Sequence, residues 1–233
     1  LTLKELPPAL FVSIARTVLG TIFTVFAASF PAYAFTRNEY WGRKFFYRFV
    51  VVTMYFSAGL IPLFLTYRTI GIYNTFWVYI IPGIVTPFNL ILCKTYIESL
   101  PASLEESAEI DGAGYLVRYF RLILPLSKPI LATVSVFSAV GQWNNWMDTV
   151  LYTKDKSLQT LQYVLYRYLN EANTLAEIAR EDPSAMNADL ATQLSPLTIK
   201  YTISIVTILP ILLVYPFFQK YFVKGIMIGA VKG

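Results

Sequence analysis

The chain has 233 residues, of which 56% are hydrophobic and 14% are charged, and its mean hydropathy is +0.53. Because an ordinary soluble domain carries about 25% charged residues, this composition argues against a soluble protein and indicates an integral membrane protein. The net charge of +5 fits the cytoplasmic excess of Lys and Arg in membrane proteins, so we expect no nucleic-acid partner. The absence of histidine and the single cysteine, Cys93, give no basis for a metal site or an internal disulfide.

Five apolar stretches are long enough to cross a membrane, because a hydrocarbon core of ~30 Å needs ~20 helical residues. In chain order they cover about residues 9–35, 45–67, 75–97, 130–152 and 199–222. None of them alternates as a membrane-spanning strand would. We therefore expect a single domain over residues 1–233, an all-α transmembrane bundle of five spans. Prolines predict kinks or breaks, and they stand at positions 31, 62, 82, 87 and 210.

The basic residues that flank these stretches predict the orientation of the chain. Lys and Arg clusters follow the first and fifth stretches and lie between the third and fourth, which places eleven basic and six acidic residues on one side. The other side has eight of each. Because cytoplasmic loops are enriched in Lys and Arg, the first side is expected to be cytoplasmic. Residues 98–129 and the C-terminus then lie inside, and the loop of residues 153–200 lies outside.

The outer loop is long and polar, but part of it has helical periodicity. Apolar residues between Ser157 and Leu169 recur at helical spacing, which predicts an amphipathic helix. The segment Asn173–Arg180 is a weaker helix candidate.

The cytoplasmic segment 98–129 contains a second predicted helix, Ala102–Ile110. Pro101 favours a helix start, and Glu105 and Glu106 lie in the first turns, where the helix dipole favours acids. Gly112 then permits a change of direction. Such a helix, lying across the cytoplasmic face, is suited to dock into a groove of another protein; the alternative is a solvated connecting loop.

The same segment resembles the EAA loop of binding-protein-dependent ABC importer permeases, which reads Glu-Ala-Ala, three residues, Gly, nine residues, Ile, one residue and Leu-Pro. The spacing matches throughout, with Ser in place of the middle Ala and Leu in place of Ile, at Glu106, Ser107, Ala108, Gly112, Leu122, Leu124 and Pro125. Both departures are small in volume, so the helix should still dock. By this resemblance the residues that couple to the ATPase are Glu105, Glu106, Ser107, Ala108, Asp111, Gly112, Ala113, Leu124 and Pro125.

Three further stretches, residues 124–129, 141–144 and 224–233, resemble the carbohydrate branch of these permeases, which handles oligosaccharides and polysaccharide fragments. The chain is similar to the smaller permease of maltose-type systems. The family usually has six spans, so a first span is expected to be missing here. The resemblance implies location in the bacterial cytoplasmic membrane, among lipid. It also implies a second, different permease, two ATPase subunits that use ATP and Mg, and an extracytoplasmic binding protein.

This chain has no phosphate-binding loop, so we expect no cofactor in it and no enzyme activity of its own. The outer loop 153–200 is a candidate contact for the binding protein; the alternative is a lid over the bundle.

A polar stretch near the outer end of the fourth span is the predicted substrate path. Amides and an indole suit a sugar, because amides bond to hydroxyls and a Trp face packs against the ring. Gln142, Asn145, Trp146 and Thr149 are expected to share one helical face. The alternative is an aromatic belt with helix–helix hydrogen bonds. The path candidates are Gln142, Trp143, Asn145, Trp146 and Asn89.

Two other polar residues in or beside the spans have their own expectations. Asn74 is a weaker path candidate at the start of the third span. Arg16, within the first span, is expected to reach the outer interface, or to attract an anionic sugar.

Two other classes of protein compete with this interpretation. An ion-coupled secondary transporter would need intramembrane acids for coupling; Asp148 lies near a span end, and the spans otherwise hold essentially none. A membrane enzyme would need a nucleophile–base pair or paired carboxylates, and the spans show neither.

Overall fold

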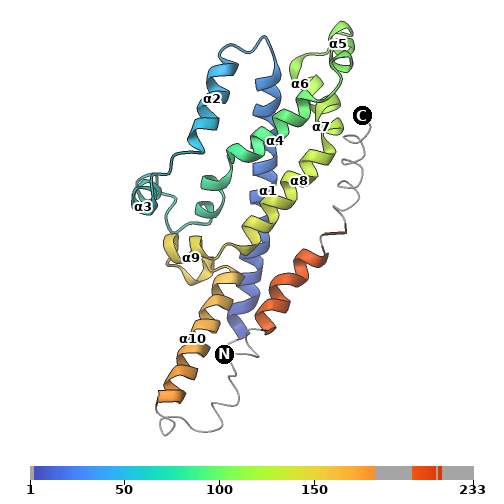
Figure 1. Ribbon diagram of the computed structural model, residues 1–233. Helices are drawn as coiled ribbons and strands as arrows, with labels where there is room; N and C mark the ends of the chain where they lie inside the picture. Colours follow the sequence, from blue (N-terminus) through green and yellow to red (C-terminus); the bar gives the residue numbers. More distant parts are fainter. Residues whose placement is uncertain (1–2, 182–200, 214, 217–233) are drawn as a thin grey trace.

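The computed structural model describes residues 3–181, 201–213 and 215–216 (Figure 1). This part of the chain is helical and contains no strand. The α-helices up to residue 181 are α1 (Leu6–Thr36), α2 (Arg43–Thr53), α3 (Leu60–Thr69), α4 (Pro87–Glu98), α5 (Ala102–Ile110), α6 (Tyr115–Arg118), α7 (Leu124–Leu126), α8 (Lys128–Asn144), α9 (Met147–Tyr152) and α10 (Leu161–Glu181). The described segment 201–213 is also helical.

Helix α1 runs lengthwise through the molecule, with α4 and α8 packed beside it (Figure 1). Its small residues Ala28 and Ala32 are 1% and 0% exposed and allow this close approach. They share a core with Leu90 of α4 and Val134 of α8. Pro31 does not break α1, which continues to Thr36. The first predicted span therefore lies within one continuous helix.

The second predicted span, residues 45–67, is interrupted between two helices, and the interruption lies before Pro62, where a kink or break was expected. Helix α2 ends at Thr53 and α3 begins at Leu60. Gly59 takes φ 83° and ψ 174°, a conformation essentially restricted to glycine, and Pro62 lies in the first turn of α3, where it needs no N–H bond.

The third and fourth predicted spans are also interrupted. Residues 76–83 form two short 3-10 turns, and α4 begins at Pro87 after a bend of 47°. This break agrees with the one expected at Pro82 and Pro87. Helix α8 ends at Asn144, and α9 starts only at Met147.

In the described residues, one helix, α1, is long and apolar enough to cross a membrane, and up to three spans result if each bent helix pair counts as one. This count is lower than the five predicted spans, but it covers only the described residues and therefore does not test that prediction. Parts of the fifth predicted span, residues 199–200, 214 and 217–222, lie outside the described residues.

The two predicted extramembrane segments lie at opposite ends of the molecule. Helices α5, α6 and α7 gather at one end, and α10 extends from the other (Figure 1). The helices predicted within Ser157–Leu169 and Asn173–Arg180 are confirmed as helical from Leu161 onward, but they are parts of one unbroken helix, α10, Leu161–Glu181. A 3-10 turn, Lys156–Leu158, precedes it. The carboxylate of exposed Asp155 accepts a bond from Ser157 N–H at 2.8 Å, which lowers the pKa of this carboxyl.

Asn74 joins two loops instead of facing the bundle interior. Its Oδ1 accepts hydrogen bonds from the backbone N–H groups of Lys154, at 2.7 Å, and Asp155, at 2.9 Å. Its own N–H donates to the carbonyl of Tyr152 at 2.9 Å. With φ 56°, Asn74 also has the left-handed conformation that Asn tolerates well. The side-chain acceptor of Asn74 is therefore occupied by backbone N–H groups. These contacts explain why an asparagine stands here without any contact to a sugar.

Replacing Asn74 by alanine should lower the free energy of unfolding by about 2 kcal/mol, because two hydrogen bonds and the tolerance for positive φ are lost together. Thermal unfolding of the purified protein in lipid nanodiscs measures the effect. Asn74→Asp keeps the acceptor and the tolerance for positive φ, so it should lose clearly less; equal losses in the two variants would contradict this account of Asn74.

Candidate functional site

A cavity of about 750 Å³ opens beside the interruption between α8 and α9. Its wall is formed by α1, α3, α4, α8 and α9 and by the 3-10 turns before α4. Most lining residues are apolar or aromatic. The polar side chains of its wall include Arg16, Asn89, Gln142, Asn145 and Asp148.

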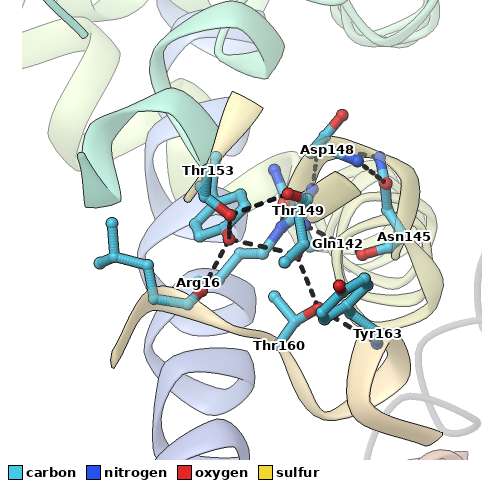
Figure 2. Close-up of polar contacts among 10 residues, drawn as sticks. Arg16, Gln142, Asn145, Asp148, Thr149, Thr153, Thr160 and Tyr163 are labelled. Atoms are coloured by element: carbon cyan, nitrogen blue, oxygen red, sulfur yellow. Dashed lines mark hydrogen bonds and ion pairs between the residues drawn. The ribbon is translucent and has the colours of Figure 1, made fainter. Parts of the chain in front are cut away.

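Arg16 is the centre of a polar cluster at this cavity (Figure 2). Its Nε donates to Gln142 Oε1 at 2.7 Å, and Nη1 donates to the carbonyl of Asn145 at 3.0 Å. Nη2 forms an ion pair with Asp148 Oδ2, and the guanidinium lies 4.7 Å from the ring centroid of Tyr79. The residue is only 2% exposed. The expectation that Arg16 reaches the outer interface or attracts an anionic sugar is therefore corrected: its charge is neutralised inside the chain.

The interruption after α8 creates this arrangement. Asn145 takes an extended conformation, with ψ 111°, and ends α8. Its side chain then accepts from the N–H of Asp148 at 3.1 Å and donates to Asp148 Oδ2 at 2.9 Å. The turn thereby holds the carboxylate against Arg16. The prediction that Gln142, Asn145, Trp146 and Thr149 share one helical face is wrong, since no continuous helix joins them.

A second polar network fixes α9 and the start of α10 beside the cluster (Figure 2). The Tyr79 hydroxyl donates to the carbonyl of Leu158 at 2.7 Å and lies 3.1 Å from Thr149 Oγ1. Thr149 Oγ1 in turn lies 2.9 Å from Thr160 Oγ1. Because these groups are buried and bonded, the part of the cavity wall formed by α9 is rigidly placed.

The structure separates the predicted path residues into two groups. Asn89, Gln142 and Asn145 line the cavity. Trp143 is 6% exposed, packs against helix α10 and donates its indole N–H to the carbonyl of Thr207 at 3.1 Å. Trp146 stacks on Tyr166, with ring centroids 4.0 Å apart. Both indoles thus contact other helices, and the role of all five residues in transport stays a prediction.

The sequence reasoning missed the pairing of Arg16 with Asp148. The available signal was the presence of opposite charges in two otherwise apolar stretches. Charges within a membrane are costly unless they pair or face water. Two opposite charges in apolar stretches are therefore candidates to form an ion pair with each other.

Gly20 allows the Gln142 side chain to reach Arg16. A Cβ atom at position 20 would lie 2.7 Å from Gln142 Nε2 and 2.9 Å from its Cδ. Gly20→Ala should therefore displace the flexible Gln142 side chain and remove its hydrogen bond to the Arg16 charge, which costs about 1.5–3 kcal/mol of stability. Gly141→Ala is the matched control, since nothing lies within 4 Å of that site in the helix. Thermal unfolding of both variants checks this, and equal stability of the two would contradict it.

At the other end of the molecule, α5 covers the predicted helix Ala102–Ile110. Gly112 follows with φ 78°, so the predicted glycine turn is confirmed. The N–H of Ala113 donates to the carbonyl of Ala108 at 2.9 Å and closes the helix.

The residues with predicted coupling roles differ in exposure. Glu106, Ser107, Asp111 and Gly112 are exposed, and Ala108, Ala113 and Leu124 are half-buried. Glu105 is 7% exposed and forms an ion pair within the chain. Pro125 is exposed in the short helix α7, which follows a single π-helical turn. Their coupling role stays a prediction.

Comparison with known proteins decides the family. The sequence profile of binding-protein-dependent transport system inner membrane components matches residues 20–228. The chain belongs to this family. The match covers α5 and the cavity helices from residue 20 of α1 onward.

Members of the family with described transport systems are similar along nearly the whole chain. The polygalacturonan/rhamnogalacturonan transport system permease protein YtcP of Bacillus subtilis is 40% identical over 228 residues, which are 97% of this chain and 77% of that protein. Protein LplC of Bacillus subtilis is 39% identical, over 95% of this chain and 73% of its own. The arabinooligosaccharides transport system permease protein AraQ of Halalkalibacterium halodurans is 29% identical, over 97% of this chain and 72% of that protein.

A solved bacterial ABC transporter involved in the import of the acidic polysaccharide alginate has a chain of the same fold. The two chains superpose with a TM-score of 0.80 and are 30% identical, and the match covers 94% of this chain and 76% of the solved one. Since these family members are transport permeases, this chain is a membrane transport component and not an enzyme.

Proposed function

We propose that this chain is one permease subunit of an ATP-driven importer for oligosaccharides, in which it forms half of the translocation path. The observation that carries the proposal is the family match over residues 20–228. The names of the relatives support the substrate class, since they include a polygalacturonan/rhamnogalacturonan system, arabinooligosaccharide systems and an alginate importer.

The cavity beside α9 supports a path for hydroxyl-rich ligands. Its polar lining combines amides with a compensated ion pair, and its aromatic lining includes Tyr67 and Phe137. Amides bond to sugar hydroxyls, and aromatic rings pack against the apolar faces of sugar rings. Because Arg16 and Asp148 neutralise each other, this half of the path offers no net charge. Selection of an acidic sugar would then fall to the second permease or the binding protein.

Helix α5 is the proposed contact for the ATPase. It lies at the end of the bundle opposite α10 (Figure 1), and its exposed residues include Leu104, Glu106 and Ile110, the last 87% exposed. An acid flanked by apolar residues on one short helix suits a groove of another protein. ATP and Mg would be bound by the ATPase subunits, because this chain has no phosphate-binding loop.

The exposed apolar helices α2 and α3 support placement beside lipid and a second permease. Neither helix has a buried residue. Phe45, Phe49 and Ile61 are 68%, 60% and 70% exposed. Surface of this kind needs lipid or a protein partner. An extracytoplasmic binding protein would approach from the α10 end, with the C-terminus of this chain in the cytoplasm.

The competing proposal, an ion-coupled secondary transporter, would need a carboxylate that binds and releases a cation. In the described residues, the charged side chains of the cavity wall are Arg16 and Asp148, and they form an ion pair. Within the described residues, the cavity wall thus offers a coupling ion no carboxylate that is free of a basic partner. The cavity therefore favours the ATP-driven proposal.

A binding screen tests the substrate class. The binding protein that accompanies this permease should be titrated with oligogalacturonides, arabino-oligosaccharides and neutral gluco-oligosaccharides, and each ligand that binds should then be supplied in radiolabelled form to cells with and without this chain. We expect binding of at least one oligosaccharide and loss of its uptake without the chain. Unchanged uptake of every bound sugar would refute the proposal.

A further inference from the structure

Glu105 is a buried acid on a helix that is otherwise largely exposed. It is 7% exposed, whereas its neighbours Leu104 and Glu106 are exposed. A carboxylate is retained in a buried position only where cations and hydrogen-bond donors compensate it. The contacts of Glu105 therefore show which part of the molecule α5 is attached to.

These contacts come mainly from the end of α1. The hydroxyl of Tyr33 donates to Glu105 Oε1 at 2.8 Å, and Arg37, the residue after α1, forms an ion pair with Oε2. The Arg37 guanidinium lies 5.0 Å from the Tyr33 ring centroid, so the two partners also hold each other. Arg118 of α6 adds a longer contact to Oε1 at 3.8 Å. Oppositely charged and hydrogen-bonded groups thus attach α5 to α1.

The other two glutamates of α5 differ in what they contact. Glu109 pairs with Arg118 at 2.9 Å, a contact to the next helix in the chain. Glu106 is exposed, and within the described residues it has no hydrogen bond or ion pair. One short helix thus carries three residues of the same type, of which only Glu105 bonds to α1.

Helix α1 also carries Arg16 at the cavity. Arg16 and Tyr33 are 17 positions apart on one continuous helix, which corresponds to about 25 Å along its axis. The main packing partners of α1 are α4 and α8, which also line the cavity. A displacement of α5 that is passed to α1 would therefore move the Arg16 end of the cavity wall.

We propose that Glu105 is a positioning residue that locks α5 to the cytoplasmic end of α1, so that movement of α5 is transmitted along α1 to the cavity. This inference rests on the proposed function of α5 as the ATPase contact. It assigns Glu105 a different task from Glu106: Glu106 faces the ATPase, and Glu105 transmits the movement. Removing the charge of Glu105 should uncouple ATP hydrolysis from transport without releasing the ATPase.

Three isosteric variants in the complete complex separate these tasks: Glu105→Gln, Glu106→Gln and Glu109→Gln. The complex, with its binding protein, is reconstituted into proteoliposomes, and three quantities are measured: retention of the ATPase subunits, binding-protein-stimulated ATP hydrolysis, and sugar taken up per ATP hydrolysed. For Glu105→Gln we expect normal retention and hydrolysis but at least a five-fold fall in sugar per ATP, about the lower end of coupling between distant sites. Glu109→Gln, the matched control, should keep its sugar-to-ATP ratio within about two-fold of the unmodified complex.

A further variant and a distance measurement by spectroscopy distinguish loss of the Glu105 contacts from general misfolding. Tyr33→Phe removes one hydrogen bond to Glu105 and keeps the ring, so it should lower the ratio in the same direction. Spin labels at two exposed positions, Asn38→Cys and Ser103→Cys, report the placement of α5 relative to the end of α1. Their distance distribution should broaden with Glu105→Gln and not with Glu109→Gln.

Each outcome bears on one of the two proposals. An unchanged ratio for Glu105→Gln, equal falls for Glu105→Gln and Glu109→Gln, or an unchanged distance distribution would overturn the transmission role. Loss of the ATPase from Glu105→Gln would also overturn it, because the residue would then act in docking. If Glu106→Gln retains the ATPase and full transport while Glu105→Gln uncouples, the transmission role is supported and the docking role of Glu106 in the proposed function fails.

Discussion

The variant Asp148→Ala is expected to lose most of its folded, transport-competent population. The substitution leaves the Arg16 guanidinium, 2% exposed, without its ion-pair partner. Breaking a buried pair by removing one partner costs ~3–5 kcal/mol, because the remaining charge is uncompensated. The free energy of unfolding in lipid bicelles measures this loss, and uptake in cells should fall with it.

The double variant Arg16→Met/Asp148→Leu is the control for this prediction. Replacing both charges by apolar groups of similar volume is often neutral for stability, so the double variant should be more stable than Asp148→Ala alone. It should still transport poorly, because the polar wall of the cavity is gone. A double variant no more stable than the single one would show that the ion pair is not what holds α1 to the α8–α9 turn.

The variant Glu106→Arg is expected to abolish retention of the ATPase subunits and, with it, uptake. Glu106 is exposed on α5 and has no ion-pair partner within the described residues, so the substitution should leave the fold of this chain intact. A like charge placed against a complementary surface costs several kcal/mol of binding, enough to release a partner. Co-purification of the ATPase from solubilised membranes measures the effect.

Glu39→Arg is the matched control for Glu106→Arg. Glu39 is also exposed and lies near the same end of the molecule, but it is outside α5. It should leave retention unchanged. Retention by the Glu106→Arg variant equal to that of Glu39→Arg would contradict the placement of the ATPase on α5.

The sequence predicted α5 well because its signals are local. Pro101 starts the helix, and Gly112 ends it with a positive φ, so neighbouring residues alone determine its bounds. Helix α10 was less well predicted, because polar residues interrupt its apolar spacing after Leu169 and made one helix, Leu161–Glu181, look like two.

The cavity was only partly predictable, because its geometry depends on residues far apart in the chain. Gln142, Asn145 and Asn89 were recognised from polarity at membrane depth. The turn at Asn145 was not, because the residues before and after it are compatible with a continuous helix. The partner of Arg16 lies 132 positions away, and no periodicity within one stretch reports such a contact.

The central claim, ATP-driven import through this permease, is tested most directly in proteoliposomes that contain the complete complex, with binding protein and labelled oligosaccharide outside. The account predicts sugar accumulation that requires ATP and Mg on the ATPase side and persists when ionophores abolish the proton and sodium gradients. Accumulation that needs an ion gradient and proceeds without ATP would contradict it.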